Sequence, residues 1–245
     1  MPPPTTDPST IQILPGYRPG ILGRTLEMHM DYYGPLAGWG HYFESYMASS
    51  LGPFLKRLDD AVDPFSKPPT TPEEKAAAAA KCEVIESSKG RNQVWTAIQT
   101  EPDTGKQRIV GTAYIDGDFY RLGEHKEEGG EEVCRLRFVI VDESVRGMGI
   151  GGKLFDAAMA FVGEKGYREC RLSTSKALKA AVKIYERGGF VLVQDKIEEY
   201  IREDNGKKEF WNMRDYVWRR DGNVGANGGA GAARADDDKP GGEVD

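Results

Sequence analysis

A cluster of glycines near the middle of the chain has the residue types and the spacing that bind anions. Four of the six residues from 147 to 152 are glycines. Glycine has no Cβ, so several backbone N–H groups can converge on one anion. Residues 138–141 before the cluster predict a strand, and the residues after it predict a helix, whose first N–H groups have no partner. A strand, a glycine turn and a helix in this order are typical of a pyrophosphate site.

Two familiar nucleotide-binding patterns fit the cluster only in part. Gly147, Gly149 and Gly152 match the dinucleotide pattern G-x-G-x-x-G. That pattern belongs after the first strand of alternating βαβ units, whereas here it follows more than half of the chain. Gly147, Gly152 and Lys153 match most of a Walker A loop. Leu154 stands where that loop needs a Ser or Thr hydroxyl for Mg²⁺, which disfavours the Walker reading.

A third pattern matches the glycine cluster at every fixed position. Arg146, Gly149 and Gly151 match R-x-x-G-x-G, the pyrophosphate loop of acyl-CoA-binding proteins. A glycine-rich turn between a strand and a helix can also hold no ligand, and the loop alone does not separate these readings. The sequence downstream decides between them.

The composition is that of one globular domain. The chain has 245 residues, 39% of them apolar. It contains no run of about 18 apolar residues, so no membrane span is predicted, and the proline-rich start does not read as a signal peptide. Cys82, Cys134 and Cys170 are widely spaced, which indicates reduced thiols and a cytoplasmic or nuclear setting. Three histidines and no Cys-x-x-Cys pair do not indicate a metal site.

The net charge of −6 is concentrated in two acidic segments. Residues 123–132 carry −4, and residues 221–245 carry another −4, so the rest of the chain carries +2. A mildly basic body suits a polyphosphate ligand. It is too weakly charged to predict nucleic-acid binding.

The hydrophobic patterns predict strands and helices on both sides of the glycine cluster. Apolar and β-branched runs predict strands at residues 11–14, 93–99, 108–114, 132–141, 168–174, 191–201 and 210–218. Helical spacing predicts helices at residues 22–33 and 41–58, separated by a break at 34–40, another from the cluster to 166, and a last one from about 175 to 187.

We expect one domain at residues 10–219, with the ends at 1–9 and 220–245 disordered. Insertions are expected near residues 61–90, including a helix that begins at Thr71, and at 116–131, which reads as a charged loop.

Two motifs in register resemble the GNAT superfamily of acetyl-CoA-dependent N-acetyltransferases. The first is R-x-x-G-x-G at Arg146, after the fourth predicted strand. The second is A-x-x-[IL]-Y-E-x-x-G-F, which fits Ala181, Ile184-Tyr185-Glu186 and Gly189-Phe190. The resemblance covers about residues 10–219 outside the insertions. It implies an α/β (α+β) fold with a mixed central sheet of about seven strands, flanked by about four helices and splayed between the fourth and fifth strands.

The N-terminal third resembles a narrower group, the GNAT domains found in fusions with MarR-type regulators. The matching residues are Arg18-Pro-Gly, Gly23, His29, Tyr33, Gly38-Trp39 and Phe43-Glu44. No winged-helix segment is recognisable, so the resemblance implies only the catalytic domain.

The resemblance implies acetyl-CoA as cosubstrate and no metal. The residues implied in pyrophosphate binding form the loop Arg146, Gly147, Met148, Gly149, Ile150, Gly151 and Gly152. The backbone of Val139, Ile140 and Val141 is implied to pair with the pantetheine arm. Leu178 departs from the family, since many relatives have an Asn there that holds this arm, and Ser175 is the candidate to replace it.

Amide formation from a thioester needs a proton for the leaving thiolate and an unprotonated amine. Tyr185, in the second motif, is the implied acid. Glu44 is the leading candidate for the base and also for binding the acceptor, with His29, Glu27 or a water chain as alternatives. Tyr33 and Trp39 are candidates for the wall of the acceptor pocket with His29, although each can equally be a core aromatic residue.

We therefore expect direct transfer of an acetyl group to a primary amine in a ternary complex, with a small-molecule acceptor favoured. The resemblance leaves room for a homodimer and implies neither nucleic acid nor membrane as partner. A protein-lysine acetyltransferase stays open as an alternative. So does a module that binds acyl-CoA without turnover, which the departure at Leu178 would suit.

Overall fold

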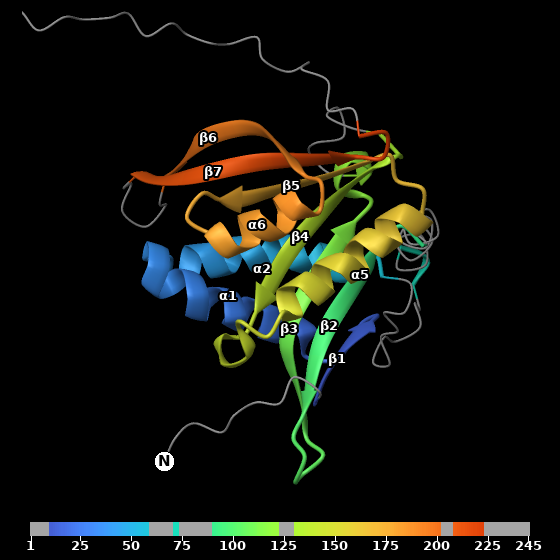
Figure 1. Ribbon diagram of the computed structural model, residues 1–245, viewed down its shortest axis with the longest axis vertical. Coiled ribbons are helices and arrows are strands. Elements are labelled where there is room, and N and C mark those ends of the chain that lie inside the picture. Colours follow the sequence, from blue (N-terminus) through green and yellow to red (C-terminus); the bar gives the residue numbers. More distant parts are fainter. Residues whose placement is uncertain (1–9, 59–70, 74–89, 123–129, 202–207, 223–245) are drawn as a thin grey trace, which may run out of the picture.

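Seven strands form one mixed sheet in the order β1-β2-β3-β4-β5-β7-β6, and helices cover both of its faces (Figure 1). The computed structural model describes residues 10–58, 71–73, 90–122, 130–201 and 208–222. The strands are β1 (Ile11–Pro15), β2 (Gln93–Thr100), β3 (Gln107–Asp116), β4 (Val133–Val141), β5 (Glu169–Ser175), β6 (Val191–Ile201) and β7 (Lys208–Arg219). The helices of the described ranges are α1 (Ile21–Ala37), α2 (His41–Leu55), α4 (Phe119–Leu122), α5 (Ile150–Glu164), α6 (Lys179–Arg187) and a short 3-10 turn at Glu143–Val145. The predicted fold class and the seven strands are confirmed.

Alternation of side chains along β2 and β3 creates two hydrophobic cores, one on each face of the sheet. Trp95 and Ile115 join the core that packs against α5. Val94 and Tyr114, which neighbour them in the sequence, join the second core beneath α1 and α2. The N-terminal helices and α5 therefore lie on opposite sides of the same strands.

The hydrogen-bonded ladder between β4 and β5 is short. It is parallel and pairs only Val133 with Glu169, Cys134 with Cys170 and Arg135 with Arg171. Beyond these pairs β5 continues to pair with β7 as far as Ser175, while β4 continues to pair with β3. The two strands separate after Arg135, which confirms the predicted splay between the fourth and fifth strands.

A β-bulge at Phe138 lies where the two strands separate. The pairing of β4 with β3 passes from Tyr114–Arg137 to Thr112–Ile140, so Phe138 and Val139 both lie opposite a single residue. Phe138 has a φ of 48°, in the left-handed region that non-glycine residues rarely occupy. The Thr112 hydroxyl donates to the Phe138 carbonyl at 3.1 Å. A bulge bends its strand, and this one bends β4 beside the opening.

The predicted break between the first two helices is shorter than expected. Gly34 and Pro35 belong to α1, which continues to Ala37, and only residues 38–40 separate it from α2. Proline inside a helix removes one hydrogen bond. Here Pro35 is exposed, so water can reach the unpaired carbonyl. The helix ends where Gly38 adopts a φ of 70°.

The expectation of a charged loop at residues 116–131 is wrong for its first seven residues. Asp116 and Asp118 are each only 1% exposed, and residues 119–122 form α4. These aspartates fold inward because arginines distant in the sequence neutralise them. Residues 123–129 lie outside the described residues. So do residues 1–9 and the tail after 222, both predicted to be disordered, and the helix predicted from Thr71 onward except for its first three residues.

Only glycine fits at position 188, where the end of α6 meets α5. A Cβ there would lie 2.3 Å from Cζ of Phe155. The Phe155 ring is 3% exposed and packs against Tyr185 and Phe190, so it has little room to move. We expect Gly188→Ala to lower the free energy of unfolding by about 1–3 kcal/mol, measured by urea denaturation.

The matched control is Gly163→Ala in α5, where a Cβ meets no atom within 4 Å. It is expected to be neutral or to stabilise by about 0.5–1 kcal/mol, because alanine favours helix. A Gly188→Ala protein as stable as wild type would contradict this packing.

Candidate functional site

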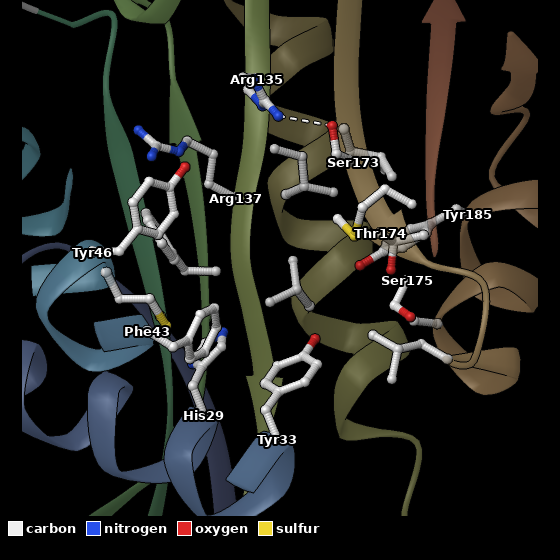
Figure 2. Close-up of a pocket in the computed structure, with 18 of the residues that line it drawn as sticks. His29, Tyr33, Phe43, Tyr46, Arg135, Arg137, Ser173, Thr174, Ser175 and Tyr185 are labelled. Carbon is white, nitrogen blue, oxygen red and sulfur yellow. Dashed lines mark hydrogen bonds between the residues drawn. The ribbon is translucent and has the colours of Figure 1, made fainter. Parts of the chain in front are cut away.

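A cavity of about 590 Å³ occupies the opening between β4 and β5 (Figure 2). Residues 135–139 of β4 line one wall, and residues 172–175 of β5 line the other. Helices α1 and α2 contribute aromatic side chains, and α6 contributes Ala181 and Tyr185. After Arg135, β4 has no strand on its β5 side, so alternate peptide groups of β4 face this opening. Val139 lines the cavity, and Ile140 and Val141 continue the strand away from it.

The glycine loop follows directly after β4. Gly147 and Gly149 have φ values of 80° and 75°, which a side chain would strain. Gly149 is the N-cap of α5 and provides no side-chain cap, so the first N–H groups of the helix, from Ile150 onward, lack intrahelical partners. No atom lies within 4 Å of where a Cβ of Gly147 or Gly149 would stand. The loop thus presents backbone donors and the positive helix end to open space, with Met148 between the two glycines.

Arg146 lies folded against the protein beside this loop. Its Nε donates to the Val141 carbonyl at 3.1 Å, and its guanidinium lies 4.4 Å from the centroid of the Tyr32 ring. Its two terminal nitrogens make no hydrogen bond within the described residues, so four N–H groups are left for an anion. The loop of residues 146–152 therefore has the donors, the charge and the open space that a pyrophosphate requires.

The Tyr185 ring lies at the cavity wall and its hydroxyl makes no hydrogen bond to the described residues. The side chain is 7% exposed and packs against Phe155 and Phe190. Burial raises the pKa of Tyr185 above its ordinary value, so the hydroxyl stays protonated at neutral pH.

Ser175 and Leu178 line the cavity at the start of α6. The Ser175 hydroxyl accepts from the Ala177 N–H at 3.3 Å, which leaves its own proton to donate. Leu178 is the N-cap residue of α6 and provides no side-chain hydrogen bond. Leu178, which cannot make the hydrogen bond of the usual Asn, and Ser175, the candidate to replace that hydrogen bond, therefore line the same cavity.

A row of stacked rings, from His29, Tyr33 and Trp39, forms another part of the cavity wall. His29 stacks on Tyr33 at 5.9 Å, and Tyr33 stacks on Trp39 at 4.8 Å between ring centroids. Nδ1 of His29 is 2.8 Å from the Thr25 carbonyl, which can only accept, so Nδ1 carries the proton and Nε2 is the acceptor. Burial lowers the pKa of His29 to about 4, against the opposing effect of this hydrogen bond. Burial also raises the pKa of Tyr33.

The structure does not bring Glu44 into the cavity. Glu44 lies in the first turn of α2 and is exposed, whereas Phe43, Tyr46 and Met47 of the same helix line the cavity. Glu27 is 60% exposed and pairs with Arg24 at 2.8 Å. Neither carboxylate is placed to take a proton from a molecule in the cavity.

Three cations that the sequence analysis did not single out line the cavity: Arg135, Arg137 and Lys196. Figure 2 shows the two arginines at one end of the exposed part of β4, with His29 and Tyr33 at the other. The sequence does carry a signal for the arginines. They occupy alternate positions of an otherwise apolar strand, and such positions share one face.

The described ranges show neither a metal-binding cluster nor a membrane-spanning helix. They contain no group of three or more His, Cys, Asp or Glu side chains arranged to hold a metal ion. None of their helices combines the length and apolarity needed to cross a bilayer.

Comparison with known proteins places this chain among acetyltransferases. Residues 58–190 match the family described as Acetyltransferase (GNAT) family. A curated relative, the uncharacterized N-acetyltransferase YjgM of Escherichia coli (strain K12), is 36% identical over 59 residues, 24% of this chain and 35% of that protein. The chain thus matches about a third of the length of this relative.

Solved structures share the fold at low sequence identity. Arabidopsis thaliana NAA60 in complex with acetyl-CoA has a TM-score of 0.50 at 17% identity, over 86% of this chain and 99% of that one. A GCN5-related N-acetyltransferase from Kribbella flavida has a TM-score of 0.46 at 16% identity, over 87% and 99%. Because the family match spans more than half of the sequence, this protein belongs to the acetyltransferase (GNAT) family.

Proposed function

We propose that this protein transfers the acetyl group of acetyl-CoA to a primary amine of a small molecule, by direct attack in a ternary complex. The observation that carries the proposal is the coincidence of three features in one place. The free edge of β4, the buried Tyr185 hydroxyl and an aromatic acceptor wall all face the same cavity. The glycine loop follows at the end of the same strand.

Acetyl-CoA supplies the acetyl group as a thioester. Its pyrophosphate fits the loop from Arg146 to Gly152, where backbone N–H groups and the Arg146 guanidinium are free to donate. Its pantetheine arm is extended and can pair with the peptide groups of residues 139–141 as an added strand would. Ser175 offers one hydroxyl on the opposite wall. A backbone N–H near the bulge can stabilise the oxyanion that forms on attack.

Tyr185 is the proposed proton donor to the departing thiolate. Its hydroxyl is protonated at neutral pH and has no competing partner among the described residues. Burial disfavours a phenolate and a thiolate alike, so the raised pKa does not by itself prevent transfer between them. Transfer in that direction also needs the hydroxyl to point at the sulfur, which the position of Tyr185 at the cavity wall permits.

The amine must be neutral when it attacks, and the charges of the cavity favour that form. Arg135, Arg137 and Lys196 all line it. Nearby positive charges lower the pKa of an ammonium group, so they promote loss of its proton. The proton that the ammonium group loses is accepted by water, or by Nε2 of His29, which would pass it on. Glu44 is not the acceptor, because it lies outside the cavity. His29, Tyr33 and Trp39 would form the acceptor wall.

A screen of amines for CoA release tests the proposal. The purified protein is incubated with acetyl-CoA and one amine at a time, and free thiol is measured. The panel contains amino acids, amino sugars, simple alkylamines and a lysine-containing peptide. We expect release that depends on the amine and is fastest with a small molecule. Binding of acetyl-CoA without release on any amine would support a binding module instead, and release on the peptide alone would support a protein acetyltransferase.

Tyr185→Phe is expected to lower kcat by roughly 10²-fold, the low end for loss of a general acid. Affinity for acetyl-CoA should be kept, since the ring and its packing remain. Steady-state kinetics and calorimetry measure the two quantities.

The matched control for this variant is Tyr167→Phe. Tyr167 is a second buried tyrosine, whose hydroxyl donates to the Arg91 carbonyl at 2.7 Å outside the cavity. It should lose stability but keep kcat. An equal loss of kcat in both variants would mean that packing, and not proton donation, explains the effect of Tyr185.

His29 should make the fold sensitive to moderate acid. Its pKa is about 4 when folded, below the ordinary value of 6.5. Between these values the unfolded chain binds a proton that the folded one does not, so stability falls as pH falls through this window. The loss attributable to His29 between pH 7 and pH 5 is about 2 kcal/mol.

Urea denaturation of wild type and His29→Gln at both pH values measures this loss. The pH dependence should be smaller in His29→Gln by the amount stated, and unchanged in His41→Gln, since His41 is exposed. An equal pH dependence in wild type and His29→Gln would show that His29 is not held neutral.

A further inference from the structure

The cations of the cavity differ in how their charges are compensated. Nη1 of Arg137 lies 2.9 Å from a carboxylate oxygen of Asp116. Nζ of Lys196 lies 2.9 Å from a carboxylate oxygen of Asp215. Arg135 has no carboxylate within 4 Å among the described residues, and its hydrogen bond goes to a neutral group, the Ser173 hydroxyl, at 2.8 Å. Within the part of the chain that the structure describes, one guanidinium at the cavity wall is therefore not paired with an acid.

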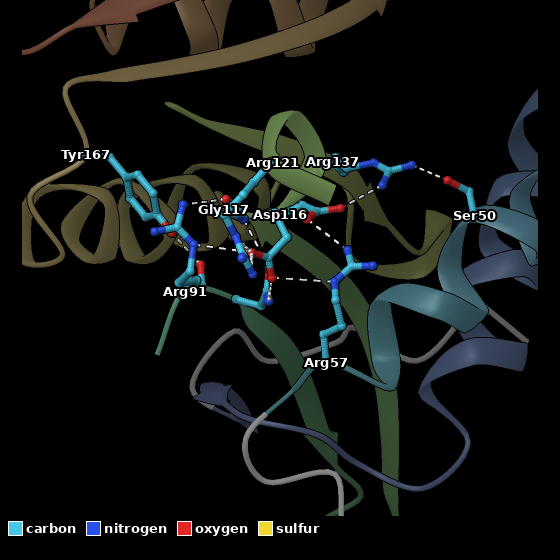
Figure 3. A network of polar contacts seen from close by, with 10 residues as sticks. Ser50, Arg57, Arg91, Asp116, Gly117, Arg121, Arg137 and Tyr167 are labelled. Atoms are coloured by element: carbon cyan, nitrogen blue, oxygen red, sulfur yellow. Dashed lines mark hydrogen bonds and ion pairs between the residues drawn. The ribbon is translucent and has the colours of Figure 1, made fainter. Parts of the chain in front are cut away.

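Two buried aspartates behind the cavity wall, Asp116 and Asp118, are already paired with other arginines. Figure 3 shows Asp116 between Arg57 and Arg137, and each of its two oxygens accepts from one of these guanidinium groups. Asp118 pairs with Arg91 and Arg121. These four arginines surround two aspartates, so the cluster behind the cavity wall carries more positive than negative charge. It gives Arg135 no spare carboxylate.

Asp215 does not compensate Arg135 either. One of its oxygens accepts from the Ser173 hydroxyl at 2.5 Å, and the other lies 2.9 Å from Nζ of Lys196. Ser173 thus accepts from Arg135 and donates to Asp215, which fixes the serine and one edge of the guanidinium. Phe119 fixes its plane, with the ring centroid 4.3 Å from Cζ of Arg135. The remaining N–H groups of Arg135 are held in place and have no hydrogen-bond partner among the described residues.

A fixed guanidinium with unused N–H groups binds a carboxylate well, because two parallel hydrogen bonds can form at once. Arg135 lies four residues before Val139 on β4, roughly 13 Å at about 3.3 Å per residue, and its guanidinium is held on the β5 side by Ser173. A molecule with an amine near the bulge and a carboxylate near Arg135 fits the cavity of about 590 Å³.

We propose that the acceptor is an amino carboxylate, an amino acid or a close relative, whose carboxylate is bound by Arg135. This inference rests on the proposed function and names the substrate class for it. The bound carboxylate supplies the negative charge that the described residues do not provide for Arg135. Lys196 and Arg137 keep their own partners, Asp215 and Asp116.

Matched amines test the inference directly. L-Phenylalanine is compared with 2-phenylethylamine, and L-lysine with 1,5-diaminopentane, so each pair differs only by the carboxylate. We expect kcat/KM to favour the carboxylate-bearing member at least tenfold in one pair or both. Arg135→Met should reduce that ratio to below threefold, and Arg135→Lys should give an intermediate ratio, because lysine keeps the charge but not the paired hydrogen bonds.

The control is Arg168→Gln, which removes a cation that is 72% exposed and pairs with Glu132 outside the cavity. It should keep the wild-type ratio. Thermal denaturation of each variant shows whether it is folded, and Arg135→Lys serves if Arg135→Met does not fold. Wild type that uses both members of each pair equally well would overturn the inference and leave the proposed function standing. So would an Arg135 variant with the wild-type ratio.

Binding of products separates the inference from the proposed function. In the presence of CoA, N-acetyl-L-phenylalanine and N-(2-phenylethyl)acetamide are titrated into the protein by calorimetry. We expect the carboxylate-bearing ligand to bind at least tenfold more tightly, and this preference to disappear in Arg135→Met. If no amine releases CoA but this preference holds, the proposed function fails and carboxylate binding by Arg135 stands. If the two ligands bind equally, the inference fails whatever the turnover.

Discussion

The site exists because the ladder between β4 and β5 stops after three residue pairs, at Arg135 and Arg171. A strand inside a sheet normally has both edges satisfied, and an unsatisfied edge in the interior is costly. Here β5 takes its other hydrogen bonds from β7, and the Phe138 bulge bends β4 at the opening. In the proposed function, the free edge of β4 is where the extended arm of the cosubstrate pairs. The cavity lies in this opening, and Tyr185 of α6 lines it.

The opening between β4 and β5 is also positively charged. The arginines and aspartates beneath the cavity satisfy one another closely, yet the arginines outnumber the aspartates, and Arg135 is left with a neutral partner. Arg135 is only partly buried, and a fixed guanidinium with no acidic partner among the described residues suits a ligand that supplies the opposite charge.

The sequence predicts those features that depend on neighbouring residues. The strands, the helix that follows the glycine cluster and the cavity position of Tyr185 rest on local periodicity or on short motifs, and the structure places them at or near the predicted residues. Features that depend on distant partners were missed. Asp116 and Asp118 were predicted to be part of a charged loop. No pattern near them in the sequence indicates that they form ion pairs with the distant Arg57 and Arg91. Glu44 was the leading candidate for the base because Phe43-Glu44 matches the resembled group, and such a match does not say which side of the helix lines the cavity.

Titration of acetyl-CoA by calorimetry tests the central claim most directly, namely that the glycine loop and the free edge of β4 form one cosubstrate site. Gly149→Val places a side chain at a φ of 75° in the loop, and Gly105→Val places one at 67° in the β2–β3 turn, each with open space around it. The two variants carry similar backbone strain, but Gly105 does not belong to the loop. We predict at least tenfold weaker binding of acetyl-CoA by Gly149→Val and unchanged binding by Gly105→Val. Wild-type affinity in Gly149→Val would contradict the account.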